Sequence, residues 1–474
     1  MIEFKSRKER LTYNDVYNYV RKAEIQQYKY MKLKNLYDNE NTRIKHKVVE
    51  DTSRPNNKIS VSYPSFVVDN SVGYFLGGKK PISYSFGEYD EELAQVFQEI
   101  HKYNDDSTQN VEVGKSCAVY GSACQMLWID NETKIRYTNI PIEQCVFIRS
   151  CDLESELIGF IRFWREDVDE HECTYMEYYT KTDVTKFYAD GDGNILNHAE
   201  PQEHFWGQVP VVYFMNDSDA SGELAKLEDV FDGINQVLSE CRDNQEMFAN
   251  CILKVAGVSI DNDVAEQIRT MRLINSDEPF DAEYIVKPDE SASTEVFLQN
   301  LIKTVHKLSG VIDLSDSTFL NQASGISLQM QLSLLEFKTS QKENHMRKAL
   351  LRRCELILHM MSLLGQVQGD LADILSNIDI TFKRNVVNVV TEQLDNAIKA
   401  SSIISKRSVL SMLDGIIDNV DEELERLAEE KEESISFMQD NFDAHNPQYA
   451  DDEEETWDIG SKDKEQEEEQ EEDE

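Results

Sequence analysis

Two long helical patterns separated by a short insertion constrain the fold of this 474-residue chain more than any other feature. Apolar side chains recur at helical spacing over residues 222–256, which predicts a helix of about thirty residues, roughly 45 Å long. A second helix is predicted over residues 291–313. The insertion, residues 257–290, is a small mixed stretch that contains a strand-like AEYIVKP. These patterns predict a helical hairpin whose faces one chain cannot bury by itself.

A third and longer helix is predicted over residues 326–364, a stretch without proline or glycine. The polar and small segment LSDSTFLNQASG precedes it, and a strand-like IDITFKRN, residues 378–385, follows. Further helices are expected over residues 391–439. The chain then ends in a low-complexity acidic segment, residues 451–474, whose composition predicts disorder.

The N-terminal half mixes helices and strands. Amphipathic helices are predicted over residues 11–37 and 90–104. From CAVYGSACQMLWID at residue 117 onward, β-branched and aromatic runs between polar turns predict a mainly β region. Within it, DGDGN at residues 190–194 favours a hairpin turn over a calcium loop, because the glutamate that such a loop requires is missing. This mixture predicts an α+β fold.

The octapeptide GYFLGGKK, residues 73–80, matches the front end of a phosphate-binding loop. Lys80, however, stands where a Ser or Thr hydroxyl should bind Mg²⁺. A short helical pattern also precedes the first glycine and a strand pattern follows Pro81, which is the reverse of the order that such a loop needs. The sequence therefore predicts a turn between a helix and a strand, and no nucleotide site.

The net charge of −42 is unevenly distributed. Residues 1–60 carry a net charge of +6, whereas residues 421–474 carry −21. Tight phosphate binding requires clustered Lys and Arg, so this balance excludes a protein that coats nucleic acid, although not one past which DNA slides. No apolar run is long enough to span a membrane, and the charged start lacks the apolar core of a signal peptide. The chain is therefore expected in the cytosol.

No arrangement typical of an enzyme is found in the sequence. His198 and His204 lie near glutamates but without the spacing of metal ligands. Ser122 is followed two residues later by Cys124, where a nucleophile elbow requires glycine. Eight scattered cysteines without a C-x-x-C motif predict buried free thiols. We therefore predict a protein that is not an enzyme and has no cofactor or metal.

Several segments, taken in order, resemble the portal proteins of tailed bacteriophages, in the branch typical of long-tailed phages of Gram-positive bacteria. The segments are SFVVDNSVGYFLGGKKPISY (65–84), VEVGKSCAVYGSACQMLWID (111–130), IRYTNIPIEQCVFIRS (135–150), WGQVPVVYFMND (206–217), LEDVFDGINQVLSECRDNQEMFAN (227–250) and ASGISLQMQLSLLEFKTSQKENHMRKALLRR (323–353). No single motif is diagnostic, but the ordered set is specific. The resemblance also explains GYFLGGKK as a structural turn.

The resemblance implies a ring of about twelve copies around a channel for double-stranded DNA, located at one vertex of the capsid. The parts of such a subunit are called wing, stem, clip and crown. The wing would comprise residues 1–221 with 325–390, and the stem residues 222–256 and 291–313. A small α/β clip would lie at 257–290 and a helical crown at 391–450. A tunnel loop would lie at 314–324, and the disordered acidic tail at 451–474.

Particular residues receive roles from this resemblance. The tunnel-loop residues expected to contact DNA are Ser317, Asn321, Gln322 and Ser324. The basic residues expected to face the channel are Lys303, Lys307 and Lys338. The clip residues expected to contact partner proteins are Arg269, Arg272 and Glu283.

The resemblance also implies partners and a location. A separate terminase motor would dock on the clip, head-completion or adaptor proteins would replace it, and scaffolding and major capsid proteins would contact the wing or crown. No membrane is involved, and the protein would be assembled in the host cytoplasm and kept in the virion.

Two other functions compete with this one. A ring ATPase that moves DNA by itself is disfavoured by the failed phosphate-loop match. An acidic DNA-mimic or basic-protein-binding structural protein remains an alternative, although it would need less β structure and shorter helices than this chain has.

Overall fold

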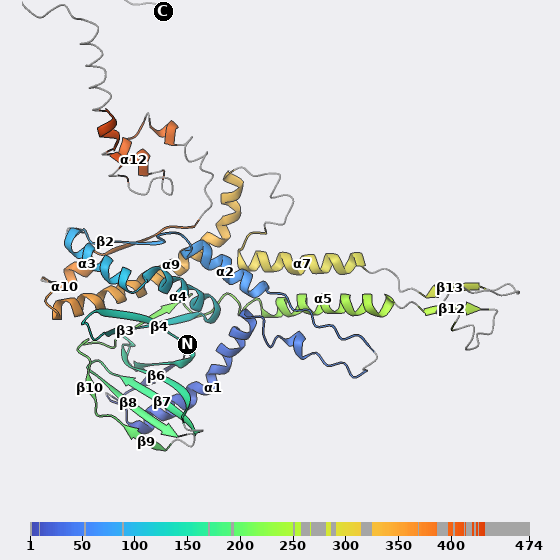
Figure 1. Cartoon of the computed structure of the whole chain (residues 1–474), viewed down its shortest axis with the longest axis horizontal. Coiled ribbons are helices and arrows are strands. Elements are labelled where there is room, and N and C mark those ends of the chain that lie inside the picture. Colours follow the sequence, from blue (N-terminus) through green and yellow to red (C-terminus); the bar gives the residue numbers. More distant parts are fainter. Residues whose placement is uncertain are drawn as a thin grey trace, which may run out of the picture. The chain divides into compact units, whose positions relative to one another are not determined.

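The computed structural model describes residues 2–8, 10–51, 54–87, 90–168, 171–190, 194–249, 252–256, 266, 281–285, 291–313, 325–367 and 369–385, with short stretches between 397 and 431. The chain divides into two compact units, Met1–Asn385 and Val386–Glu474, and each is described by itself. In the first unit we distinguish the body, residues 2–227 with 325–385, from the hairpin, residues 228–309 (Figure 1).

The larger sheet of the body has seven strands. They are β1 (Glu3–Ser6), β5 (Cys145–Ser150), β6 (Leu157–Val168), β7 (His171–Tyr179), β8 (Asp183–Asp190), β9 (Ile195–His198) and β10 (Gln202–Glu203). The order is β1-β5-β6-β7-β8-β10, with β9 also paired to β8. The β1–β5 pair is parallel and the other pairs are antiparallel. Because β8 and β9 pair on either side of DGDGN, the predicted hairpin is confirmed.

The N-terminal helix packs against this sheet. Helix α1 (Tyr13–Tyr37) begins with a capping box, in which the Thr12 hydroxyl accepts from the Asp15 N–H and the Asp15 carboxylate accepts from the Thr12 N–H. Val16 of α1 is buried in the same core as Phe147 of β5. The helix predicted for this region is therefore confirmed.

A smaller sheet, in the order β11-β3-β4, lies against helix α4 (Asp106–Tyr120). Its strands are β11 (Val211–Met215), β3 (Ser122–Ile129) and β4 (Ile135–Ile140). The prediction of β structure from Cys117 onward is wrong for residues 117–120, which form the last turn of α4. The helix ends at Gly121, whose φ of +85° is the left-handed conformation that glycine tolerates. The apolar and aromatic residues of that turn gave a false strand signal.

GYFLGGKK has the local structure that the sequence predicted. Helix α2 (Tyr63–Leu76) ends at Gly77, and β2 (Ile82–Ser85) follows and pairs antiparallel with β14 (Asp379–Phe382). The helix–turn–strand order is confirmed, and it is the reverse of a phosphate-binding loop. The other short elements of the body are α3 (Asp90–Tyr103), α10 (Leu371–Ser376) and the 3₁₀ turns η1 (Arg43–His46) and η3 (Ile142–Gln144).

The longest helix, α9 (Gly325–Leu363), has 39 residues, as the unbroken helical pattern predicted. Its C-terminal half passes through the main core of the body, where Leu350, Ile357 and Met361 are fully buried. None of the helices in the described parts of the chain is long and apolar enough to cross a membrane.

The hairpin consists of α5 (Glu228–Ala249), β12 (Ile252–Ala256), β13 (Asp281–Ile285) and α7 (Ser291–Ser309). Helices α5 and α7 lie side by side, and β12 pairs antiparallel with β13 beyond the helix ends (Figure 1). The prediction of a helix through residues 222–256 is therefore wrong at both ends, since α5 has 22 residues and is about 33 Å long. Its last residues form β12 because they pair with β13, a partner that is distant in sequence.

The second unit is described only in part. It contains helix α12 (Lys406–Ser411) and helical residues at 397–400 and 426–431. These agree with the helices predicted over residues 391–439. The acidic segment 451–474 lies outside the described residues, so its disorder stays a prediction.

Candidate functional site at the base of the hairpin

The residues predicted to contact DNA lie in a segment that the structure does not describe. All four, Ser317, Asn321, Gln322 and Ser324, fall within residues 314–324. Both flanks of this segment are described, since α7 ends before it and α9 begins directly after it. The site can therefore be built from the way the body holds these two flanks.

A close backbone crossing fixes the place where the chain leaves the body for the hairpin. A Cβ atom on Gly121 would collide with the Ala220 carbonyl oxygen, and one on Gly222 would collide with the Val119 carbonyl oxygen. Glycine is the residue that allows so close an approach at both positions. The N–H of Glu223, the next residue, donates to a carbonyl of the last turn of α4 at 2.7 Å. The Glu223 side chain is thereby placed at the base of the hairpin.

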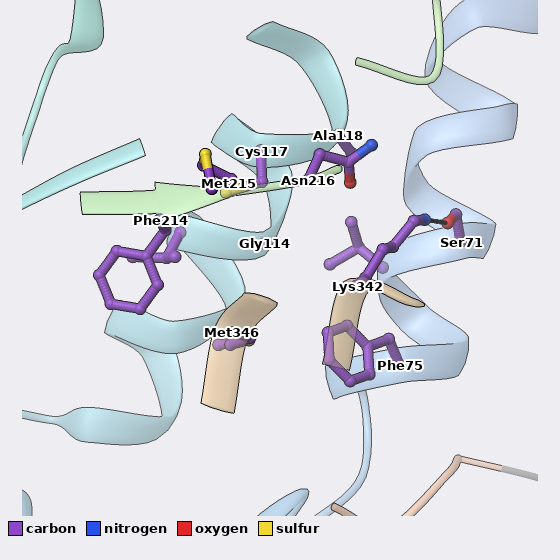
Figure 2. Close-up of a pocket in the computed structure, with 12 residues that line it drawn as sticks. Ser71, Phe75, Gly114, Cys117, Ala118, Phe214, Met215, Asn216, Lys342 and Met346 are labelled. Atoms are coloured by element: carbon purple, nitrogen blue, oxygen red, sulfur yellow. Dashed lines mark hydrogen bonds between the residues drawn. The ribbon is translucent and has the colours of Figure 1, made fainter. Parts of the chain in front are cut away.

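Glu223 binds two lysines of α9. Its carboxylate oxygens lie 2.6 Å from the Lys342 ammonium and 3.6 Å from the Lys338 ammonium. Burial alone would raise the pKa of Glu223, but the two ammonium groups outweigh it and hold the pKa below its ordinary value. Lys342 also donates to the Ser71 hydroxyl at 2.7 Å, as Figure 2 shows. This cluster joins α2 and α9 to the segment that leads into the hairpin.

Lys338 also holds the end of α7. Its ammonium donates to the Leu308 carbonyl oxygen at 2.7 Å. Two residues later, Gly310 adopts φ +80°, and a Cβ atom there would lie 3.3 Å from the Leu335 nitrogen of α9. The stretch that leads into the undescribed segment 314–324 is thus anchored to α9 at Leu335 and Lys338, about ten residues after that helix begins. Lys338, which the sequence assigned to the channel, has two partners within its own chain, and no local sequence signal predicted them.

The other two lysines assigned to the channel lie on α7. Lys303 and Lys307 are exposed, on the side of α7 opposite to Leu301 and Val305, which pack in the core shared with α5. Their contact with DNA stays a prediction.

The tip of the hairpin carries one of the residues predicted to bind partner proteins. Glu283 of β13 pairs with Lys254 of β12 at 2.6 Å, and both side chains are more than half exposed. Arg269 and Arg272 lie outside the described residues. Contact of these three residues with a partner stays a prediction.

A small hollow lies beside Lys342, between α2, α4, α9 and β11 (Figure 2). Its volume of 20 Å³ is the space of about one water molecule. Most of the lining is apolar, including Phe75, Phe214 and Met346. It is far too small for a nucleotide or an organic cofactor.

The body also contains a buried polar cluster that the sequence did not reveal. Arg353 of α9 is 0% exposed, and its guanidinium donates to Tyr84 at 2.7 Å and to Asn110 at 3.0 Å and lies 2.7 Å from Asp106. Burial alone would raise the pKa of Asp106, but Arg353 outweighs it and lowers that pKa. Burial lowers the pKa of the neighbouring His101 to about 4, so its imidazole is neutral at pH 7. This arrangement connects α4, α9 and β2, and it serves packing.

The described parts of the chain contain no group of three His, Cys, Asp or Glu side chains arranged to hold a metal ion. His204 is adjacent to a glutamate in the sequence, but in the structure its Nε2 atom lies 3.1 Å from the Thr180 carbonyl oxygen. The described cysteines are free; Cys117, Cys124, Cys145 and Cys354 are buried as predicted, whereas Cys151 is exposed and Cys173 and Cys241 are half-buried.

Comparison with known proteins identifies the family of this chain. Residues 15–436 match the family described as "Phage portal protein, SPP1 Gp6-like". The portal protein of Bacillus phage SPP1 is 21% identical over 416 residues, which cover 83% of this chain and 80% of that protein. The portal protein of Clostridium phage phiCD119 is 22% identical over 444 residues, which cover 87% of this chain and 94% of that protein. The chain therefore belongs to the SPP1 Gp6-like phage portal proteins, a structural and non-enzymatic family.

Proposed function

We propose that copies of this chain close into a ring whose central channel conducts double-stranded DNA at one vertex of a phage capsid. Membership in the portal family supports this function. The hairpin is the observation that carries the ring, because α5 and α7 pack on one another and still leave Met247, Val296 and Phe297 more than half exposed. Copies set side by side would bury these faces through a heterologous interface that closes by rotation.

The parts of the subunit follow the described elements. The body, with residues up to 390, would be the wing, and α5 with α7 would be the stem. We move the start of the clip from residue 257 to residue 252, because β12 pairs with β13. Residues 391–450 would be the crown, and 451–474 an acidic tail.

The tunnel loop, residues 314–324, would contact the DNA that passes. Asn321, Gln322 and Ser324, with Ser317, offer weak and exchangeable hydrogen bonds to a phosphate backbone. The cluster around Glu223 supports this role, because it holds the end of α7, from which the chain enters the loop, against α9. The net charge of −42 also supports passage of DNA through the channel, because carboxylates repel phosphate and leave no site where the DNA would bind tightly.

The energy for packaging would come from another protein. GYFLGGKK forms a helix–turn–strand unit, so we assign ATP hydrolysis to a terminase that docks on the clip, near Arg269, Arg272 and Glu283. Head-completion proteins would replace the terminase, and scaffolding and major capsid proteins would bind the wing or crown. The ring would be assembled in the host cytoplasm and stay in the virion.

Native mass spectrometry of the purified full chain, with negative-stain images, tests the ring. We expect closed rings of about twelve copies with a central hole. A chain that remains monomeric or dimeric at micromolar concentration, with its scaffolding protein present, contradicts the proposal.

In vitro packaging tests the tunnel loop. The triple variant Asn321→Ala, Gln322→Ala, Ser324→Ala should form rings normally but package DNA more slowly, because the hydrogen-bonding side chains are gone. Normal packaging by this variant would count against the role of these residues.

A further inference from the structure

The outer face of α7 is basic and partly apolar. Lys303 and Lys307 lie one turn apart, and Val296 lies two turns nearer the tip on the same face. All three side chains are exposed, and among the described residues neither lysine forms a salt bridge. The opposite face of α7 carries Leu301 and Val305, which pack in the core shared with α5. Nothing in the described part of the chain covers the outer face.

A hollow of 580 Å³ lies on the other side of α5, between α5, α1 and η1. Two large apolar side chains of α1 line it while remaining open to solvent: Tyr28 is 71% exposed and Met31 is 61% exposed. Glu228, Asp229 and Asp232 of the first turns of α5 line it as well. The hollow therefore offers both apolar contact area and carboxylates.

Four carboxylates line this hollow, with Glu40 as the fourth, and they outnumber its basic side chains. Lys32, Arg43 and His46 also line it, but Lys32 already pairs with Glu228 at 2.6 Å. Within the described residues, Asp232 has no salt-bridge partner. Burial, together with neighbouring carboxylates, raises the pKa of Asp232 in spite of Arg43 and Lys32. A further cation would be bound favourably there.

The two surfaces lie at the same level of the hairpin. Helices α5 and α7 run antiparallel, and Gly233 faces Leu301, since a Cβ atom on this glycine would lie 3.7 Å from that side chain. Counted from this contact, Lys303 lies level with about residue 231 of α5, and Lys307 with about residue 227. The carboxylates of the hollow occupy this same interval. Figure 1 shows α7 and η1 on opposite sides of α5.

We propose that the outer face of α7, centred on Lys303 and Lys307, docks into the hollow around Tyr28, Met31 and Asp229 of the next copy of this chain. The proposal rests on the ring proposed above and names the contact that closes it. The two surfaces differ and lie on opposite sides of α5, so the contact repeats head to tail and cannot form a two-fold dimer. Both lysines thereby receive a protein partner in place of the DNA that the sequence suggested.

Disulfide cross-linking tests this contact directly. We would combine Lys303→Cys with Asp232→Cys in a Cys151→Ser background, since Cys151 is an exposed native cysteine. Lys303 lies on the face of α7 that is turned away from α5, and Asp232 lies on the face of α5 that lines the hollow with α1 and η1. A disulfide between the two new thiols must therefore join two copies. Oxidised rings should give a ladder of covalent multimers on a non-reducing gel, and a variant that carries only one of the two new cysteines should not.

Charge reversal gives an independent readout. Lys303→Glu with Lys307→Glu should reduce ring yield at least tenfold, and adding Asp229→Lys with Asp232→Lys should restore it. Lys102→Glu with Lys134→Glu, a change at two exposed lysines of the body, is the matched control and should leave ring yield unchanged.

The outcomes separate this contact from the proposed function. Closed rings without the cross-linked ladder would overturn the contact and leave the ring intact. Normal rings from the Lys303→Glu, Lys307→Glu variant, combined with faulty packaging, would restore the DNA-facing role and overturn the contact. Wild-type protein that never closes into rings would overturn the proposed function, and this contact with it.

Discussion

The interior of the body and the outer faces of the hairpin use charged side chains in opposite ways. In the body, Arg353 is completely buried, and its guanidinium is bound by Asp106 and Tyr84 of the same chain. On the hairpin, Lys303 and Lys307 are exposed, at a place where another copy could bind them. One region completes its polar contacts within a single chain, whereas the other leaves them to assembly.

This difference predicts which measurement a substitution will change. Removing one partner of a buried ion pair leaves an uncompensated charge away from water, so substitutions in the body should lower the free energy of unfolding of each chain. Exposed charges contribute little to the stability of one chain, so substitutions on the hairpin should mainly change contacts between chains. The base of the hairpin, around Glu223, should respond in both measurements.

The largest effect is expected for Arg353→Met, which keeps most of the side-chain volume but leaves Asp106 buried without its cation. The free energy of unfolding should fall by about 3–5 kcal/mol, measured by urea denaturation. Arg352→Met is the matched control, because its pair with Glu355 is partly exposed and should cost less than about 1 kcal/mol. Equal losses from both substitutions would break the distinction between interior and surface charge.

The next effect is expected at the backbone crossing. Gly121→Ala should cost about 2–4 kcal/mol, because the residue has φ +85° and its new Cβ atom would collide with the Ala220 carbonyl oxygen. Gly73→Ala is its control, since this helical glycine has open space around it and alanine should stabilise the helix by up to about 1 kcal/mol. Thermal unfolding of both variants measures the difference, and a harmless Gly121→Ala would show that the crossing is not rigid.

A smaller and pH-dependent effect is expected for Glu223→Gln. The amide keeps the shape but not the charge that binds Lys342 and Lys338, so the free energy of unfolding should fall by about 1–3 kcal/mol at pH 7. The pKa of Glu223 is lowered from 4.5, so its contribution is present above that pH and is lost as the pH falls through the lowered value. The gap in urea midpoint between variant and wild type should therefore shrink as the pH is taken well below 4.5. A gap that does not depend on pH would mean that the charge of Glu223 is not what stabilises this junction.

The smallest effect on stability is expected at the tip. Glu283→Ala should lower the free energy of unfolding by less than about 1 kcal/mol, because both side chains of the Glu283–Lys254 pair are more than half exposed. If Glu283 contacts the terminase, the same variant should bind it more weakly in a pull-down. Unchanged binding would remove Glu283 from the predicted contact, and a large loss of stability would contradict the division between body and hairpin.

Strong local periodicity predicted several elements well, and tertiary pairing explains where it failed. The helix α9 and the turn at GYFLGGKK were predictable, because the residues that decide them are neighbours along the chain. Residues 117–120 looked like a strand and are helical, since the crossing at Gly121 decides where that helix ends. Residues 252–256 looked helical and are a strand, since β13 pairs with them from across the insertion.

The candidate site was predictable only in its outline. The resemblance to portal proteins, which the family match confirms, assigned a tunnel loop to residues 314–324, and that assignment stays a prediction. It did not predict that Glu223 binds Lys338 and Lys342, or that Lys338 holds the end of α7. No spacing in the sequence connects these residues.

The sequence by itself determined the α+β class, the long helices, the uneven charge and the lack of a phosphate-binding loop, because each depends on residues that are close along the chain. Only the tertiary structure decided which charges pair. With 90 acidic and 48 basic residues, the composition allows far too many pairings for sequence to select one. Burial and distance select them, as Arg353 with Asp106 and Glu223 with Lys342 show, because Coulomb energy depends on separation in space and on the exclusion of water.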